Sequence, residues 1–332
     1  MRSFRKPSRG LRTVGLAVIF ALVQPWLLVG AAYAAYNEQT DTRLPLDSDD
    51  SYDFDIADVD GVNGLDILVA NRGQSRLLMN NGSGAFTDET ATRLGVALHT
   101  TLAVAFGDVD GVNGPDALLV GEGQNRILIN DGSGNFTDQT ASRLPVGSQT
   151  SLDVALGDVD GDGDLDAVIA NRGTANQLLL NNGSGVFSAA PAGRLAVDSD
   201  LSYGVALGDV NGDGSLDIFF ANFAGQNRLH LNNNLGVFTD VTATQVPVST
   251  IGTGSAVMFD ADGDGDTDIA TADGGAGVGL LLNDGAGAFT NAPAGQVPAV
   301  TAFAVKVVAG DIDFDGSQDA GGCARSGQRA AQ

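Results

Sequence analysis

The sequence predicts an all-β protein, a β-propeller of about six four-stranded blades in which the last blade is incomplete. A short aspartate-rich loop recurs six times in 332 residues, and successive copies start 50 or 51 residues apart. Short apolar runs and glycine-containing turns fill each interval. Four-stranded units repeated every 40–50 residues or so are typical of propeller blades, which pack radially and bury both faces of each sheet.

The first 34 residues are predicted to be a signal peptide. Basic residues up to Arg12 precede an apolar stretch over residues 14–29, and Ala32-Tyr33-Ala34 has the small-x-small form that signal peptidase recognises. The alternative is an uncleaved membrane anchor, which Gln24-Pro25 disfavours by interrupting the apolar stretch. We therefore expect a secreted, periplasmic or cell-surface protein with no stable membrane span after signal cleavage.

Residues 35–320 are predicted to form the propeller, and each period shows the same order of strands. One apolar run precedes the acidic loop, as at residues 152–156, and another follows it, as at residues 165–170. A third run, Gln177–Leu180, leads into an Asn/Asp-Gly turn, and the phenylalanine five residues after the start of that turn begins a fourth strand. No helical period of 3.6 residues follows the signal segment.

The two ends of the chain are expected to close the ring together. Residues 36–45 match residues 136–145, so an outer strand at Tyr36 and an inner strand at 302–309 are predicted to share a blade. No apolar run follows the sixth loop, and residues 321–332 are expected to be an atypical, disordered tail. This departure leaves two alternatives open, a truncated seven-bladed ring and a non-functional fragment.

The acidic loops are predicted cation sites. In the third copy, DVDGDGDLD from Asp158, carboxylates at positions 1, 3, 5 and 9 converge because Gly161 and Gly163 permit a tight reversal with positive φ. Position 7, Asp164, would offer its carbonyl. Several hard oxygen ligands on a flexible loop favour Ca²⁺ over Mg²⁺. An EF-hand is disfavoured, because Ile169 stands where its bidentate glutamate would be and the flanking residues are strand-like.

The copies differ in their expected ligands. Four loops are predicted to be firm calcium sites, and two are predicted to be weaker because Val62 and Val112 replace the carboxylate at position 5, with Asn63 and Asn113 as candidate substitutes. The alternative to cation sites is that the loops are simply polar turns between strands, but a generic turn does not need aspartates at alternate positions in six copies. The firm ligands are Asp158, Asp160, Asp162, Asp164, Asp166, Asp209, Asn211, Asp213, Asp217, Asp260, Asp262, Asp264, Asp268, Asp311, Asp313, Asp315 and Asp319, and the weaker ones are Asp58, Asp60, Asp66, Asp108, Asp110 and Asp116.

Loop, turn and phenylalanine recur in phase, as in VALGDVDGDGDLDAVIAN followed by NQLLLNNGSGVF. Such repeats closely resemble FG-GAP/VCBS repeats, the calcium-binding propeller repeats also found in integrin α-subunits. The resemblance covers about residues 36–319 and implies a propeller whose loop aspartates ligate Ca²⁺. Triplets such as Ala70-Asn71-Arg72 replace the integrin Gly-Ala-Pro element, so the resemblance implies fold and calcium rather than receptor function.

No catalytic constellation is found, and we expect a binding or adhesion module rather than an enzyme. His99 and His230 lie far apart in the sequence, Cys323 is alone, and no Gly-x-Ser-x-Gly motif is present. The net charge of −24 disfavours nucleic acid as a partner, which leaves an extracellular protein or glycan. The alternative is a polysaccharide lyase or hydrolase, which acidic and basic residues converging at the mouth of the central channel would favour.

Overall fold

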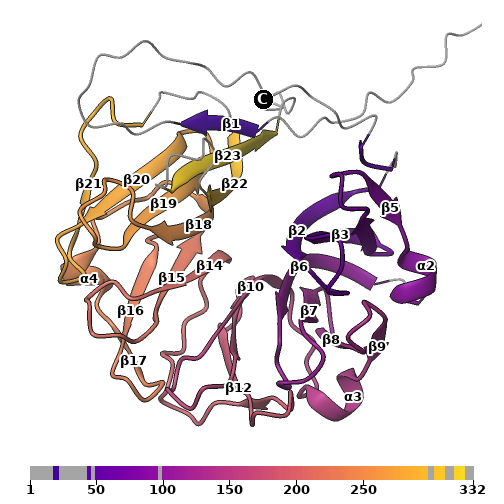
Figure 1. The fold of residues 1–332 in the computed structure, drawn as a ribbon. Helices are drawn as coiled ribbons and strands as arrows, with labels where there is room; N and C mark the ends of the chain where they lie inside the picture. The colour runs from indigo at the N-terminus through magenta and orange to yellow at the C-terminus, as the bar shows by residue number, and fades with distance from the viewer. Residues whose placement is uncertain are drawn as a thin grey trace, which may run out of the picture.

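The computed structural model describes residues 18–21, 43–45, 49–95, 99–297, 303–310 and 318–325. They form β-sheets arranged in a ring around a central hollow (Figure 1). Five units of four antiparallel strands, blades 1 to 5, are followed by a three-stranded sheet, blade 6. The predicted all-β propeller with an incomplete last blade is therefore confirmed.

Blades 1 to 5 share one plan in which the chain runs from the innermost strand outward. Each inner strand pairs with the strand that follows the acidic loop, and blades 1 and 2 are also joined where Gly73 pairs with His99. The strands, from the inside outward, are as follows: in blade 1, β2 (Ser51–Ala57), β3 (Asp66–Gly73), β4 (Arg76–Asn80) and β5 (Phe86–Asp88); in blade 2, β6 (His99–Gly107), β7 (Asp116–Gly121), β8 (Arg126–Asn130) and β9 (Phe136–Asp138); in blade 3, β10 (Ser151–Gly157), β11 (Asp166–Asn171), β12 (Gln177–Leu180) and β13 (Ser188–Ala189); in blade 4, β14 (Ser202–Gly208), β15 (Asp217–Asn222), β16 (Arg228–Asn232) and β17 (Phe238–Asp240); and in blade 5, β18 (Thr253–Phe259), β19 (Asp268–Asp273), β20 (Gly277–Asn283) and β21 (Phe289–Asn291).

Blade 6 combines the two ends of the chain. Its inner strand β22 (Phe303–Gly310) pairs with β23 (Asp319–Arg325), and β23 pairs with β1 (Val18–Ala21). The N-terminal strand of this blade comes from the segment assigned to the signal peptide, whereas the predicted strand at Tyr36 lies outside the described residues. Strand β23 also extends five residues past the expected end of the propeller at 320, because strand pairing uses backbone groups and needs no apolar run.

Arg43 supports the match between residues 36–45 and the inter-blade linkers. Its Nη1 donates to the carbonyl oxygen of Ser83 in the hairpin turn of blade 1. Arg93 and Arg143 bind the corresponding serine carbonyls, Ser133 and Ser184, of blades 2 and 3. The chain therefore enters blade 1 in the way in which it enters the next two blades.

A β-bulge begins every inner strand. In β2 the register shifts between Ser51 and Asp53, and the same shift occurs at the equivalent place in the other inner strands. A bulge changes the direction in which the next side chain points and increases the local twist. The residue after the bulge is Asp53 in blade 1, Asp153 in blade 3 and Lys306 in blade 6.

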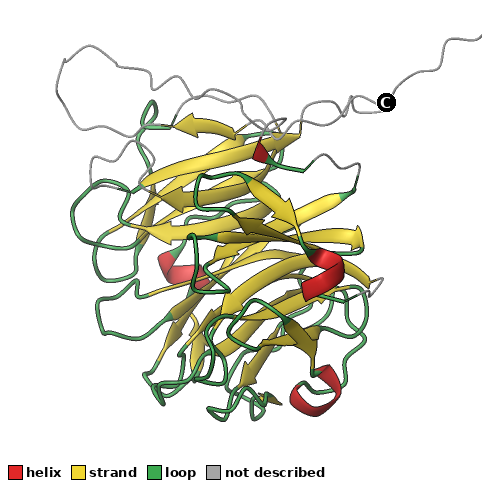
Figure 2. Ribbon diagram, turned by 45° about the vertical axis from the view of Figure 1, so that its right-hand side comes forward, coloured by secondary structure: helices red, strands yellow, loops and turns green. Residues whose placement is uncertain are grey.

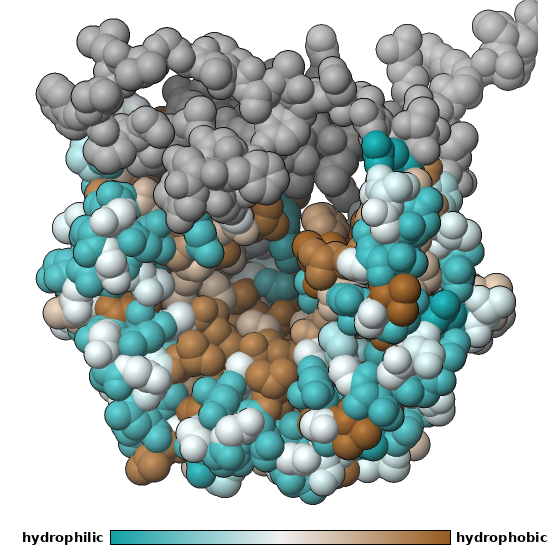
Figure 3. Space-filling model, in the orientation of Figure 1, coloured by the Kyte–Doolittle hydropathy of each residue, from teal (hydrophilic) through white to brown (hydrophobic). Residues whose placement is uncertain are grey.

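The hydrophobic core lies between blades, as radial packing requires. Leu68 of blade 1, for example, is fully buried in a cluster with Val104 and Phe136 of blade 2. Figure 3 shows apolar surface around the central hollow and hydrophilic surface over the outside of the ring. The short apolar side chains of these strands thus provide the stability of each junction through burial.

The face of blade 1 that points away from blade 2 is the exception. Phe54 is 44 % exposed, whereas Val104, at the same position in blade 2, is 5 % exposed. Tyr52 and Ile56, which share this face with Phe54, are also exposed. Apolar packing therefore does not seal the junction between blade 6 and blade 1 as it seals the others.

Single helical turns occupy three of the linkers and were not predicted. They are α2 (Thr90–Arg93), α3 (Thr140–Arg143) and α4 (Thr242–Gln245), and they lie at the outside of the ring (Figure 2). Four residues are too few for a 3.6-residue period to be visible. No helix among the described residues is long and apolar enough to cross a lipid bilayer.

Replacing His230 with leucine should stabilise the protein. His230 is fully buried in β16, and both ring nitrogens lack hydrogen-bond partners. Blades 1, 2, 3 and 5 have leucine at this position. An unsatisfied buried polar group costs about 1–3 kcal/mol, so we expect His230→Leu to raise the free energy of unfolding by an amount in this range.

The pH dependence provides a second measurement. Burial lowers the pKa of His230 in the folded protein, so the unfolded chain binds its proton first as the pH falls below about 6.5 and stability is lost there. Urea unfolding followed by circular dichroism at pH 7 and pH 5 should show less of this loss in His230→Leu. The matched variant Leu179→His should acquire it. Equal acid sensitivity in all three proteins would contradict the assignment.

Candidate metal centres

The acidic loops join the two innermost strands of each blade. Five of them, starting at Asp58, Asp108, Asp158, Asp209 and Asp260, lie within the described residues, whereas most of the sixth, residues 311–317, does not. The recurrent glycines give these loops the left-handed backbone that the sequence analysis expected, with φ values of 80° at Gly161 and 92° at Gly163.

The carboxylate at position 9 anchors each loop to its own blade. In the third loop, Asp166 Oδ2 accepts a hydrogen bond from Val159 N at 3.3 Å, and Oδ1 accepts one from Asn181 N at 2.8 Å. The other four described loops repeat both bonds, and all five aspartates are at most 1 % exposed. Burial raises the pKa of each, to about 6 at Asp116, Asp166, Asp217 and Asp268.

The carboxylate at position 1 is oriented by glycine amides. Asp158 Oδ1 accepts from Gly161 N at 2.8 Å, and Oδ2 accepts from Gly163 N at 3.0 Å. The loops from Asp209 and Asp260 repeat the arrangement. These bonds fix the position-1 side chain inside the loop before any ligand binds.

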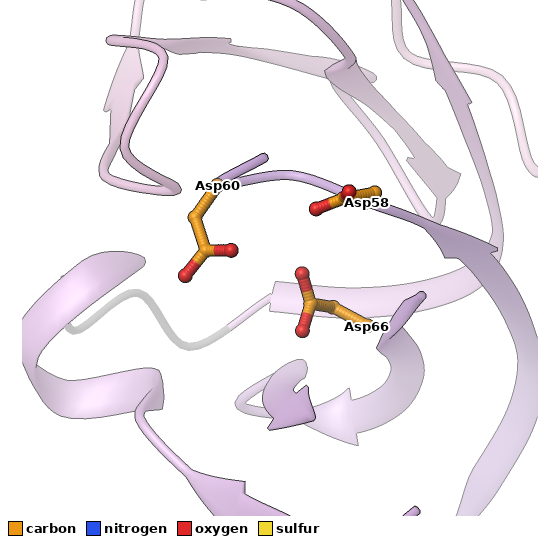
Figure 4. A group of neighbouring side chains, drawn as sticks. All are labelled: Asp58, Asp60 and Asp66. Carbon is orange, nitrogen blue, oxygen red and sulfur yellow. The ribbon is translucent and has the colours of Figure 1, made fainter. Parts of the chain in front are cut away.

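Positions 1, 3 and 9 converge. In four loops, one oxygen from each of the three carboxylates lies within 4.8 Å of the others: Asp58, Asp60 and Asp66; Asp108, Asp110 and Asp116; Asp158, Asp160 and Asp166; Asp260, Asp262 and Asp268. Figure 4 shows the first group pointing toward a common centre. The loop from Asp209 lacks a third carboxylate because position 3 is Asn211.

Positions 5 and 7 lie outside these groups. Asp162 Oδ1 and Asp264 Oδ1 accept backbone amides two residues ahead, at 3.0 and 2.9 Å, and both side chains are exposed. Asn63 and Asn113, the candidate substitutes, lie against Gly82 and Gly132 in the hairpin turns. The two loops with valine at position 5 therefore group positions 1, 3 and 9 as closely as the complete loops do.

The converging carboxylates fit a hard cation. Two oxygens bound to the same Ca²⁺ at about 2.4 Å are at most about 4.8 Å apart, which matches the observed grouping. Asp58 Oδ1, Asp160 Oδ1 and Asp262 Oδ1 are buried without a hydrogen-bond partner. A buried acceptor without a partner is destabilising by about 1–3 kcal/mol, and a bound cation would satisfy it.

The first four loops are also tied to the next blade. Asn130 Nδ2, in β8 of blade 2, donates to Val59 O at position 2 of the blade 1 loop at 2.8 Å, while Asn130 Oδ1 accepts from Gly134 N in its own hairpin turn. Asn181, Asn232 and Asn283 donate in the same way to Val109, Val159 and Val210 at 2.7–2.8 Å. The sequence analysis missed this role, although an asparagine ends or directly follows the third strand of every described complete blade.

A charged cluster lies in the central channel. Lys306 Nζ of blade 6 is 2.9 Å from Asp53 Oδ1 of blade 1 and 3.7 Å from Asp153 Oδ1 of blade 3. Burial lowers the pKa of Lys306, but the negative charges of Asp153 and Asp53 raise it by a larger amount. The net shift of the pKa is upward, so the amine stays charged. The second oxygens of Asp53 and Asp153 accept backbone amides of the next blade, from Val104 and Val205.

The fold and the loops together define a β-propeller built from aspartate-rich repeats with candidate cation sites at the blade junctions. The family model of the FG-GAP-like repeat matches residues 58–111, 113–169, 158–220, 209–271 and 260–320. The chain belongs to the FG-GAP-like repeat family. No curated protein matches the sequence.

Two of the solved structures similar to this chain share its fold. The BP39L lectin from Burkholderia pseudomallei has a TM-score of 0.55 with 16 % identity, over 80 % of this chain and 75 % of the lectin. BBS1N, crystallised in complex with ARL6DN, has a TM-score of 0.54 with 9 % identity, over 82 % and 74 %. An Agrocybe aegerita lectin specific for non-reducing terminal N-acetylglucosamine has a TM-score of 0.43 with 21 % identity, over 75 % of this chain and 65 % of the lectin.

Proposed function

We propose that this protein is an exported, calcium-stabilised β-propeller that acts as a binding or adhesion module for an extracellular protein or glycan. The grouping of three carboxylates in four junction loops supports the proposal most directly. Export is proposed from the basic and apolar N-terminal segment, and it suits calcium, which is abundant outside cells.

Calcium would supply positive charge where the chain concentrates its negative charge. The position-9 carboxylate holds the loop to its own blade, and the position-2 carbonyl holds it to the next one. A cation held between positions 1, 3 and 9 would therefore stiffen the junction as well as the loop. The proposed role of calcium is structural, and the ring presents the partner-binding surface.

Calcium titration tests the metal part of the proposal. In a calorimetric titration, protein freed of metal by a chelating resin should bind Ca²⁺ with a heat that saturates. A glycan array probed with labelled protein in Ca²⁺ and in EDTA tests the binding part. No saturable calcium binding would refute the first part, and array signals identical to a denatured control would refute a glycan partner.

Calcium affinity should fall as the pH is lowered from 7 to 5. Without an ion, burial raises the pKa of four position-9 carboxyls to about 6, so protons compete for these ligands below that pH. We expect a loss of calcium affinity of up to about tenfold per pH unit at each site. Calorimetric titrations at pH 7, 6 and 5 would show a constant affinity if the position-9 carboxylates were not ligands.

The raised pKa values of the position-9 carboxyls also mean that the folded, ion-free protein binds protons more readily than the unfolded chain. Protonation of these carboxyls therefore stabilises the folded, ion-free protein as the pH falls from 6 toward 4.

An enzyme is the second candidate, because acidic and basic residues do meet in the channel. Asp53 and Asp153 are only 6 % and 12 % exposed, and each already accepts a backbone amide of the next blade. Carboxylates that are ion-paired and hydrogen-bonded in this way are poorly placed to accept a proton from a substrate. Reducing-end release from a polysaccharide panel, abolished by Asp153→Asn in a folded variant, would favour the enzyme.

A further inference from the structure

One position in the inter-blade linkers is arginine or glutamine after every complete blade. This residue lies seven positions after the phenylalanine that begins, or immediately precedes, the fourth strand. It is arginine in the first three complete blades and glutamine in the last two: Arg93, Arg143, Arg194, Gln245 and Gln296. We call it the linker residue.

The three arginines bind the position-3 carboxylate. Arg143 Nη2 lies 3.2 Å from Asp110 Oδ2, and Arg194 Nη1 lies 3.2 Å from Asp160 Oδ2. Arg93 Nη2 is 3.8 Å from the equivalent oxygen of Asp60. These side chains are 11–28 % exposed, so the attraction is only partly screened by solvent.

The guanidinium leaves the loop open to a cation. In the third loop, Arg194 occupies Oδ2 of Asp160 while Oδ1 is buried without a hydrogen-bond partner. Arginine therefore weakens the negative field of the site without filling it.

Position 3 and the linker residue change together. Aspartate occurs with arginine in three loops, and the neutral pair Asn211 and Gln245 replaces both in the fourth. Counting positions 1, 3 and 9 with the linker residue, each of these four loops has a net charge of about −2 when all carboxyls are ionised, which one divalent cation neutralises.

The fifth loop breaks the pattern. Asp260, Asp262 and Asp268 occur with Gln296 at the linker position, so the same count gives about −3. Within the described part of the chain, Asp262 has no ion pair, and both Asp262 Oδ1 and Gln296 Oε1 are buried without a hydrogen-bond partner. The fifth loop therefore lacks the internal counter-ion that the first three have.

We propose that the linker residue sets the cation affinity of its loop, and that Gln296 makes the loop from Asp260 the tightest calcium site among the described loops. The inference rests on the proposed calcium binding and adds the rank of the sites. An opposite charge within 4–6 Å changes the equilibrium of a carboxylate by about one to three powers of ten. An arginine at the linker position should weaken calcium binding by about tenfold or more.

The linker arginine also replaces part of what an ion does for the junction. Arg93 and Arg143 each donate to a serine carbonyl in the hairpin turn of the next blade while they bind their loop. Blade 5 has no such arginine toward blade 6. The junction between blades 5 and 6 should therefore depend on calcium more than the junctions between blades 1 and 2 and between blades 2 and 3.

Calcium titrations of Gln296→Arg and Arg194→Gln test the proposal. Gln296→Arg should weaken the tightest class of sites at least about tenfold, and Arg194→Gln should tighten a weaker class by a similar factor. Val248→Arg is the matched control, because Val248 is 91 % exposed and the substitution changes the net charge equally. Asp262→Asn should weaken the tightest site to the affinity of the loop from Asp209, which has the same asparagine and glutamine at these two positions.

Hydrogen exchange of the unaltered protein gives a second readout that needs no variant. As calcium is withdrawn in steps, exchange should rise last in β18 and β22, on either side of the junction between blades 5 and 6, because the tightest site is the last to lose its ion. Unchanged tight binding in Gln296→Arg, or weakening of the tightest class in Asp160→Asn instead of Asp262→Asn, would overturn the ranking while leaving calcium binding intact. A wild-type protein that binds no calcium would overturn both.

Discussion

In EDTA the protein should melt about 20 °C below its melting temperature in saturating calcium. A ligand at one hundred times its dissociation constant stabilises the folded state by about 2.7 kcal/mol per site, so four such sites would contribute about 11 kcal/mol. This is comparable to the whole stability of a typical domain, and a domain of this size loses about 2 °C per kcal/mol. The net charge of −24 adds repulsion, part of which bound ions would relieve within the loops.

Differential scanning calorimetry in calcium, in EDTA and in magnesium measures this effect. Sodium chloride matched to the ionic strength of the calcium buffer controls for general screening of the acidic surface. Magnesium should recover only part of the loss, because it retains its water ligands. An unchanged melting temperature in EDTA would show that the loops are polar turns rather than structural metal sites.

Lys306→Met should cost about 2–3 kcal/mol, the second-largest effect we expect. Methionine keeps the length of the side chain but leaves Asp53 and Asp153 facing each other without a cation, and removing one partner of a buried ion pair is strongly destabilising. The side chain of Lys306 is 34 % exposed, so the expected loss lies below the range for a fully buried pair.

Urea unfolding followed by circular dichroism measures the loss, and limited proteolysis locates it. Cleavage should increase first next to β2 and β22, since the face of blade 1 that points away from blade 2 is not sealed by apolar packing. Lys306→Arg is the matched control and should retain most of the stability. If Lys306→Met unfolds at the same urea concentration as the unaltered protein, the ion pairs do not hold the ring together.

The fold was predictable because its signals are local. Alternating apolar runs, Asn-Gly and Asp-Gly turns and the loop spacing each fall within one 50-residue period, and they predicted strands of the right number and order. Their repetition then left a propeller as the simplest way to bury both faces of each blade. The family assignment rests on the same residues, and the repeat model confirms it.

The candidate site was only partly predictable. The grouping of positions 1, 3 and 9 follows from the loop motif, and the calcium ligands themselves stay a prediction. Three features were not predictable: Asn63 lies at the hairpin turn, Asp162 is exposed, and the linker arginines bind the position-3 carboxylates. Each depends on contacts between elements, which the spacing of residues within a loop does not reveal.

The sequence by itself determined the blade, the loop and the family, because each depends on residues that are neighbours along the chain. Only the tertiary structure decided how blades are joined. Asn130 reaches Val59 from 71 residues away, and Lys306 meets Asp53 across the whole length of the ring. Curvature around the channel brings these groups together, and a repeat pattern contains no signal for a contact that forms once, where the ring closes on itself.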